Sequence, residues 1–511
     1  MRKFFTVFLG LPLVIVAIVL TVVFLPRLAG LMRGVRPAIT PPPQDITSPS
    51  FNTTGLPLSL PPGFSIEIFA KDLPGARVML QVGREMYVSQ TSEGKITLLT
   101  LKDGEVADGE VWLKNLNKPH GLAISGDDLY YAEEDKITRV RLYTSQQPIK
   151  IADLPSGGGH FTRTIVFGSD ERLYVSIGSS CNICIEKDAR RAAIYSMNKD
   201  GSDFRSYATG LRNAVFFTWS YIDGRMWATE MGRDWLGDDL PPDEINVIEE
   251  GKDYGWPYCY TRNIADPTFA KSFDDCSGKE GNIIDIPAHS APLGLAFIPE
   301  EAPHQSSPGS DGAGYSWPDG YQHDLLVAFH GSWNRSEPTG YKVVRIKLDN
   351  EGNYQGTEDF ITGWLTPEGA LGRPVDLLIQ PGGVMYISDD KAGVIYKVTY
   401  QGKESEDLVH VDVPVPNSIV QSPLVVRGEA RGNWYFEASF PLKLSDANGN
   451  KIAEGFAQAQ GEWMTEDFVP FEGKLEFAPP ITDTGFLILE KDNPSGLPEH
   501  AAEIRVPVKF Y

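Results

Sequence analysis

The sequence is short of positive charge. Its 511 residues include 46 lysines and arginines against 68 aspartates and glutamates, which gives a formal net charge of −22 at pH 7. A protein that binds nucleic acid needs a basic surface to neutralise phosphates, so this composition excludes nucleic acid as a partner. The acidic excess by itself indicates only a solvated, self-repelling surface.

Cysteine is also scarce, with four residues at positions 181, 184, 259 and 276. Ile185 follows Cys184 where a haem attachment motif requires histidine, and the lack of a second C-x-x-C motif argues against a structural zinc site. Three disulfide pairings are possible, and the local spacing favours Cys181 with Cys184 and Cys259 with Cys276. Because disulfides persist outside the cytosol, we expect both bonds in an exported chain.

One long apolar run is present, at the N-terminus. Residues 4–25 carry no charge, are long enough to span a bilayer and exceed the apolar region of a typical signal peptide. We therefore expect residues 1–36 to form a single-pass anchor in the cell membrane, with the bulk of the chain extracytoplasmic, either periplasmic or extracellular. A cleaved signal peptide is the alternative. Residues 37–60, with three consecutive prolines, are typical of an extended tether.

A repeated unit fills the middle of the chain. Six times between residues 77 and 399, a polar or cationic residue is followed by an apolar strand, a short turn and a second apolar strand. The copies begin near Arg77, His120, His160, Arg212, Pro292 and Arg373. The first three starts lie about 40 residues apart, the period of a four-stranded blade, so the pattern predicts a six-bladed β-propeller over residues 61–400.

The pattern changes after Tyr400. Residues 401–411 form a polar hinge, and residues 412–511 hold short alternating stretches such as Trp434-Tyr435-Phe436-Glu437-Ala438. About 100 residues of short strands are typical of a β-sandwich. The predicted fold class is therefore all-β: a six-bladed propeller followed by a β-sandwich, with an N-terminal transmembrane helix.

Candidate functional residues lie at the unit starts, whose loops should gather at one mouth of the propeller channel. His160 ends the loop Gly157-Gly158-Gly159 and could accept a proton near neutral pH, unless it is a surface or structural histidine. Four arginines recur in similar places and suggest an anionic ligand: Arg163, Arg212, Arg335 and Arg373. The alternative for each arginine is a salt bridge between blades.

An acidic, glycine-containing stretch spans residues 230–239. Carboxylates beside glycine turns with free carbonyls suit calcium, which prefers oxygen ligands. The offsets of its glycines and glutamates do not match an EF-hand. An acidic surface loop without a metal is the alternative.

Six motifs together give the chain a family resemblance. In this order they are Gly159-His160-Phe161-Thr162-Arg163, Gly210-Leu211-Arg212-Asn213, Asp243-Glu244-Ile245-Asn246, Lys252-Asp253-Tyr254-Gly255-Trp256-Pro257, His330-Gly331-Ser332-Trp333-Asn334-Arg335 and Gly372-Arg373-Pro374. From about residue 60 to 399 the chain resembles the sorbosone/glucose dehydrogenase family, the quinoproteins that use pyrroloquinoline quinone on a six-bladed propeller.

The resemblance implies a set of roles. His160 would be the general base that takes a proton from a sugar hydroxyl or hydrated aldehyde while hydride passes to the quinone. The expected quinone-binding residues are Arg212, Asn213, Arg373, Arg335 and Arg163, and backbone carbonyls of Gly232 and Arg233 would bind a calcium ion. The implied protein is a membrane-anchored, outward-facing dehydrogenase of a sugar or aldehyde, dependent on pyrroloquinoline quinone and Ca²⁺.

The chain departs from this family at three places. Gly159 replaces the aspartate that precedes the base in glucose dehydrogenases. The segment Phe329-His330-Gly331 replaces a leucine–lysine pair that contacts the cofactor, leaving Arg335 or Lys342 as substitutes. Val375 replaces one of two paired arginines. These departures argue against glucose as the substrate.

The C-terminal unit has its own resemblance. Through the segments 428–434 and 490–496 it is similar to the immunoglobulin-like domain of bacterial spore-germination proteins, which implies an immunoglobulin-like sandwich that contacts a cell-envelope partner. Two other functions remain open. A non-catalytic propeller could bind glycans or envelope proteins, and a calcium-dependent lactonase would need Glu, Asn and Asp around a central metal, whereas the unit starts offer arginine and histidine.

Overall fold

The structure, a computed structural model, describes residues 39–510 apart from 44–49, 103, 270–275, 300–316, 381–382, 401–407, 417, 448–449, 466, 481 and 495–502. The predicted membrane anchor at residues 4–25 and most of the predicted hinge lie outside the described residues. Within them, no helix combines the length and the apolar character needed to cross a bilayer.

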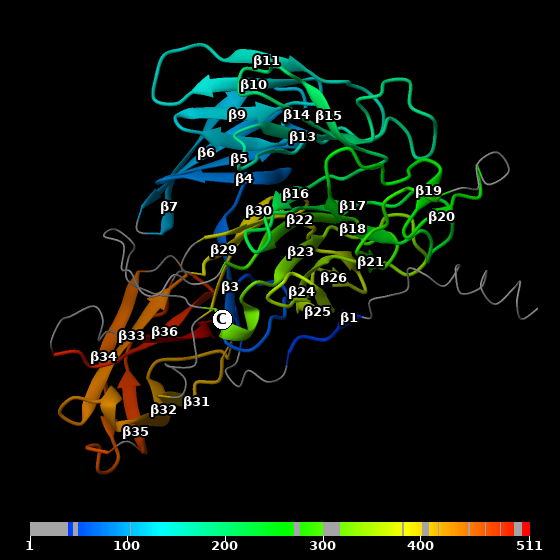
Figure 1. Cartoon of the computed structure of the whole chain (residues 1–511). Coiled ribbons are helices and arrows are strands. Elements are labelled where there is room, and N and C mark those ends of the chain that lie inside the picture. The colour runs from blue at the N-terminus through cyan, green and yellow to red at the C-terminus, as the bar shows by residue number, and fades with distance from the viewer. Residues whose placement is uncertain are drawn as a thin grey trace, which may run out of the picture.

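Six antiparallel sheets follow one another along the described chain and confirm the six-bladed propeller (Figure 1). The first blade comprises β4 (Ala76–Val82), β5 (Glu85–Gln90), β6 (Lys95–Lys102) and β7 (Glu105–Lys114). The second comprises β8 (Leu122–Ser125), β9 (Asp128–Ala132), β10 (Lys136–Arg141) and β11 (Ile149–Asp153). The third comprises β12 (Ile165–Phe167), β13 (Leu173–Ile177), β14 (Ala193–Met197) and β15 (Arg205–Thr209). The fourth comprises β16 (Phe217–Trp219), β17 (Met226–Glu230), β18 (Asp243–Ile248) and β21 (Ile284–Ile286), and the fifth β22 (Pro292–Phe297), β23 (Leu325–Phe329), β24 (Lys342–Leu348) and β25 (Tyr354–Ile361).

The sixth blade closes the ring. Three of its strands come from the end of the propeller sequence, β28 (Pro374–Ile379), β29 (Met385–Asp389) and β30 (Val394–Tyr400), and its outer strand is β3 (Phe64–Ala70), which pairs antiparallel with β30. Two short strands of the segment expected to be a tether also join the sheets in parallel: β1 (Ile39–Thr40) beside β25 and β2 (Phe51–Asn52) beside β3. Part of residues 37–60 is therefore bound along the outer rim of the propeller.

The remaining short elements lie in the connections between blade strands. They are the hairpins β19 (Cys259–Tyr260) with β20 (Ile264–Ala265) and β26 (Leu365–Thr366) with β27 (Gly369–Ala370), and the single-turn helices η2 (Thr91–Glu93) and η3 (Asp319–Tyr321). Consecutive strands of a blade run antiparallel, so the segment before the first strand and the loop joining the second and third strands end on the same face. The unit starts and these second loops therefore share one face of the ring.

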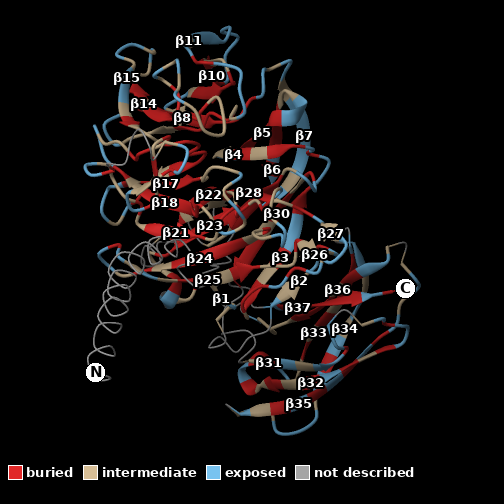
Figure 2. Cartoon of the chain, turned by 90° about the vertical axis from the view of Figure 1, so that its right-hand side faces the viewer, coloured by how far each residue is buried: buried red, intermediate tan, exposed pale blue. Residues whose placement is uncertain are grey.

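Residues 409–510 form a second body, a seven-stranded antiparallel arrangement in the order β31-β32-β35-β34-β33-β36-β37. Its strands are β31 (Val409–Val413), β32 (Leu424–Arg431), β33 (Ser439–Asp446), β34 (Lys451–Ala459), β35 (Phe468–Leu475), β36 (Thr484–Glu490) and β37 (Glu503–Lys509), with the turn η4 (Gly432–Trp434). Alternate residues point inward, and the side chains of Trp434, Phe440 and Phe471 are fully buried. Figure 2 shows buried residues along the strands of both bodies. This confirms the predicted β-sandwich.

A buried carboxylate joins the two ends of the ring. Asp376 on β28 accepts hydrogen bonds from the backbone N–H of Met79 on β4, at 2.9 Å, and of Leu377, also at 2.9 Å. Burial raises the pKa of Asp376 to about 6, although both N–H groups favour the charged form. The contact between the first and last blades therefore depends on a carboxyl group that is partly protonated near neutral pH.

We expect Asp376→Asn to remove a pH dependence of stability. The folded pKa lies above the ordinary value near 4, so the contribution of the protonated group is complete below about pH 4 and is lost as the pH rises through 6. Relative to the variant, the wild type should lose about 2 kcal/mol of unfolding free energy between pH 4 and pH 8 in urea titrations. The exposed Asp108→Asn serves as control, and equal pH dependence in wild type and Asp376→Asn would contradict the assignment.

Candidate functional site

His160 is held in one tautomer. Its Nδ1 lies 3.0 Å from the carbonyl oxygen of Ser179 and 2.9 Å from Ser179 Oγ, which itself donates to the carbonyl of Cys181 at 2.7 Å. A carbonyl only accepts and the hydroxyl proton is already used, so Nδ1 carries the ring hydrogen and Nε2 keeps a lone pair. Burial, helped by the charges of Arg212 and Arg163, lowers the pKa of His160 to about 3. The ring is therefore neutral.

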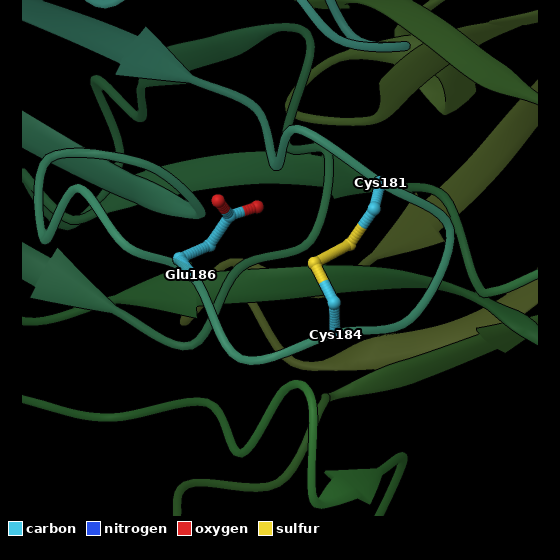
Figure 3. A group of neighbouring side chains, drawn as sticks. All are labelled: Cys181, Cys184 and Glu186. Atoms are coloured by element: carbon cyan, nitrogen blue, oxygen red, sulfur yellow. A yellow bond between two sulfur atoms is a disulfide. The ribbon is translucent and has the colours of Figure 1, made fainter.

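A disulfide loop supports this arrangement. Cys181 and Cys184 are bonded, as are Cys259 and Cys276, which confirms both predicted pairs. Figure 3 shows the first bond with Glu186 beside it, and Glu186 accepts hydrogen bonds from the backbone and hydroxyl of Ser180. Ligand atoms of Cys181, Cys184 and Glu186 lie within 4.8 Å of one another. Because the sulfurs are bonded to each other they offer no thiolate, so this group stabilises the loop and is not a metal site.

Arg212 is fully engaged by the protein. Its Nε and one terminal nitrogen donate to the backbone and side-chain oxygens of Asn182, each at 2.9 Å. The other terminal nitrogen donates to the carbonyls of Met231, at 3.1 Å, and Gly232, at 2.9 Å, and the fifth N–H reaches Asp234 at 3.1 Å. Arg212 therefore links the second loops of blades three and four. The Gly232 carbonyl, expected to bind calcium, accepts one of these bonds.

The side chains of Asn213 and His160 both pack against Gly178. A Cβ atom at Gly178 would lie 2.6 Å from His160 Cβ and 2.7 Å from Asn213 Oδ1, so only glycine leaves room for both side chains. The Asn213 backbone N–H donates to Glu230 at 3.1 Å. Burial raises the pKa of Glu230, and the neighbouring Glu244 raises it further. The structure thus brings together His160, Asn213 and Arg212, and their roles in catalysis and cofactor binding stay a prediction.

A second cationic group, which we call the Asp390 cluster, comprises Arg77, His330, Arg373 and Asp390. Asp390 pairs with Arg77 at 2.7 Å and with His330 Nε2 at 2.9 Å. Arg373 donates to the carbonyls of His330 and Gly331. Burial works to raise the pKa of Asp390, but His330, Arg77 and Arg373 outweigh it and hold that pKa at about 2. Two arginines and a histidine thus surround one carboxylate.

Sequence reasoning missed most of this cluster. In the sequence, Arg77 marks only the start of a unit, and His330 belongs to a family motif and to one of the departures from the family, with no contact to Asp390 implied. The available signal was the Asp389-Asp390 pair directly after an apolar strand. Its partners could not be identified, because Arg77 and Asp390 belong to opposite ends of the propeller sequence.

The Asp390 cluster suits an acceptor-rich ligand. Arg77 Nε and His120 Nε2 are buried and have no hydrogen-bond partner among the described residues. Arg77 lowers the pKa of His120 electrostatically, after the larger effect of burial, so the two groups are neighbours. A buried polar atom without a partner costs free energy. Burial lowers the pKa of both His120 and His330, so the positive charge of this region comes from Arg77 and Arg373, and these two guanidinium groups fit a ligand with carboxylates, such as pyrroloquinoline quinone.

The other predicted cofactor ligands have protein partners. Arg163 is fully buried and donates to the carbonyls of Pro155, His160 and Thr162, so it supports the His160 loop from beneath. Arg335 pairs with Asp239 at 2.8 Å. Lys342, the other substitute for the missing lysine, pairs with Asp359 at 2.5 Å.

Arg233, whose carbonyl was expected to bind calcium, has a side chain that pairs with Asp266 at 2.9 Å. The calcium ligands stay a prediction, as do the roles of Arg163 and Arg335.

Two family models match the chain. Residues 58–401 match the model described as TrAA12-like, and residues 408–496 match the immunoglobulin-like domain of bacterial spore germination. The second match agrees with the immunoglobulin-like sandwich predicted from sequence. An uncharacterized protein of Borreliella burgdorferi is 31% identical over 367 residues, covering 67% of this chain and 91% of that protein.

Solved structures share the propeller fold. The calcium structure of the Trichoderma reesei Carbohydrate-Active Enzymes Family AA12 protein is 19% identical with a TM-score of 0.57, covering 70% of this chain and 98% of that one. The holo form of the pyranose dehydrogenase PQQ domain from Coprinopsis cinerea is 20% identical with a TM-score of 0.55, covering 71% of this chain and all of that one.

The Asp390 cluster predicts a strong effect of Asp390→Asn. Removing the carboxylate leaves Arg77 and Arg373 uncompensated in a buried site, so we expect a loss of about 3 kcal/mol in unfolding free energy. Added sulfate should restore part of the lost thermal stability by replacing the negative charge.

A matched control is Asp203→Asn, which removes the exposed carboxylate that pairs with Arg172 and should cost about 0–1 kcal/mol. Equal destabilisation by the two variants, without rescue by sulfate, would show that the cluster does not hold a buried anion.

Proposed function

We propose that this chain, which belongs to the TrAA12-like family, is an oxidoreductase that oxidises a sugar or aldehyde with pyrroloquinoline quinone as cofactor. The observation that carries the proposal is His160 at the start of blade three, whose Nδ1 is bound to Ser179, whose Nε2 keeps its lone pair, and whose side chain is near those of Arg212 and Asn213. The names of the AA12 and pyranose dehydrogenase structures support a carbohydrate substrate.

The chain's own part in the reaction begins with a proton. The substrate hydroxyl, or the hydroxyl of a hydrated aldehyde, gives its proton to His160 Nε2, while Nδ1–H stays bonded to the Ser179 carbonyl. Because the pKa of His160 is lowered to about 3, the ring is neutral at physiological pH, but it is a weak base until a neighbouring negative charge raises that pKa. The imidazolium that forms would be stabilised by a nearby anion.

The cofactor would be held by the Asp390 cluster. Arg77, Arg373 and His330 would bind its carboxylates. Asn213 would contact the part of the cofactor that faces His160. When bound, pyrroloquinoline quinone would supply the two-electron oxidant. A calcium ion at the carbonyls of Gly232 and Arg233 would share the Gly232 carbonyl with Arg212, because a carbonyl oxygen has two lone pairs.

The cellular setting is part of the proposal. Two disulfides favour an extracytoplasmic location. An anchor at residues 4–25 would hold the propeller at the membrane surface, and the sandwich would contact a partner in the cell envelope.

One observation favours a second function. All five N–H groups of Arg212 and the ammonium group of Lys342 are already bound by protein groups, as expected of a propeller that binds glycans without catalysis. Quinone titration separates the two functions, because only the enzyme needs the cofactor.

The test is reconstitution of the ectodomain with pyrroloquinoline quinone, with and without calcium, followed by dye reduction on a panel of aldoses and aldehydes. We expect His160→Gln to bind the quinone normally and to lower kcat by about 10²–10⁴-fold, because the proton acceptor is lost. His410→Gln, a histidine on β31 of the sandwich, is the matched control and should retain wild-type kcat.

Equal turnover in His160→Gln and wild type would refute the base assignment. Glycan binding without quinone binding would select the second function. Failure of both quinone binding and dye reduction would remove the enzymatic proposal.

A further inference from the structure

Two exposed tryptophans stand together on the same face as His160. The chain has ten tryptophans, all of them in the described residues, and only Trp235 and Trp333 are exposed, each at 68%. Trp235 lies in the loop between β17 and β18, and Trp333 in the loop between β23 and β24. Their ring centroids are 5.4 Å apart at an interplanar angle of 87°, so the indoles form an open corner.

The backbone beneath the corner is cross-linked. Asn334 donates to Asp234 Oδ1 at 2.7 Å, which joins the residues adjacent to the two tryptophans. Farther along, Ser336 N–H and Arg335 bind Asp238 and Asp239. Both loops are therefore fixed relative to each other, although the indoles themselves remain exposed.

Trp235 also has a strained backbone. Its φ angle is +69°, in the left-handed region that a bulky side chain rarely adopts because of steric strain. The hydrogen bonds of Asp234 maintain this conformation: its N–H donates to Asn182 at 2.7 Å and its carboxylate accepts from Arg212 at 3.1 Å. The fold thus maintains an unfavourable backbone that presents an apolar ring to solvent.

The corner is connected to the proposed catalytic residues. Asp234 accepts from both Arg212 and Asn334, and Arg212 acts electrostatically on His160. Two carboxylates around the corner are paired with arginines, Asp234 with Arg212 and Asp239 with Arg335, and Asp238 accepts a hydrogen bond from Ser336 N–H. A ligand of the corner therefore meets apolar faces and compensated charges, which suits a neutral molecule.

We propose that Trp235 and Trp333 bind one sugar residue of a neutral oligosaccharide whose neighbouring residue reacts at His160. A pyranose ring has an apolar C–H face and polar edges, which match an indole face bordered by polar groups. This inference deepens the proposed function and rests on it for the reacting residue. It makes the preferred substrate the end of an oligosaccharide in place of a free monosaccharide.

Binding is tested first, on the full-length protein without quinone. Maltotriose, cellotriose and chitotriose are titrated while tryptophan fluorescence and calorimetric heat are recorded. We expect one of these probes to bind the wild type, and Trp235→Ala and Trp333→Ala each to weaken that binding at least tenfold. Phe456→Ala removes an aromatic side chain of similar exposure, 60%, on the sandwich, and should leave oligosaccharide binding unchanged.

Turnover of the reconstituted protein is tested second. The ratio of kcat/KM for the bound oligosaccharide to that for its monosaccharide should fall about tenfold in the tryptophan variants, mainly through KM. Binding by wild type and Phe456→Ala that is lost in both tryptophan variants supports the site even if no dye is reduced, in which case only the enzymatic function fails. No binding of any probe, or equal binding in all variants, overturns the site even if monosaccharides are oxidised.

Discussion

Antiparallel pairing of β3 with β30 is the constraint on which the rest of the structure depends. It places the two ends of the propeller sequence in one sheet, so the ring cannot open without breaking strand pairing inside a blade. The hydrogen bond from Met79 to Asp376 adds a second link between the first and last blades. Only in the closed ring do His160, Arg212 and Arg373, which lie far apart in the sequence, share one face.

Two charge networks occupy that face, and they differ in what they leave free. Every N–H group of Arg212 donates to a protein acceptor, so Arg212 fixes the loops that carry Asn182 and Asp234. The Asp390 cluster holds more positive than negative groups and leaves Arg77 Nε without a partner among the described residues. Arg163 acts electrostatically on both His160 and His120, which connects the two networks. An anionic ligand is therefore more easily accommodated beside Asp390 than beside Arg212.

Hydrogen bonds on this face connect His160 with the exposed tryptophans. His160 keeps a single tautomer because the disulfide loop fixes Ser179. Arg212 donates a hydrogen bond to Asp234, and Asp234 in turn fixes the backbone of Trp235 and the position of Asn334. A proton acceptor, an anchor for loops and an exposed aromatic corner are thus parts of one hydrogen-bonded unit, in which each member limits the movement of the next.

The sequence by itself determined what depends on neighbours along the chain. The alternation of apolar residues and turns predicted the blades and the sandwich, and short spacing predicted both disulfides, because strands, turns and small loops form from local contacts. Only the tertiary structure decided what Arg77, Asp234, Trp235 and Asp390 contact. It also decided that the outer strand of the last blade comes from the start of the propeller sequence. Hydrogen bonds and charge pairs of these residues join segments tens to hundreds of positions apart. Ring closure decides which side chains meet across such a separation, and it leaves no periodic signal in the sequence.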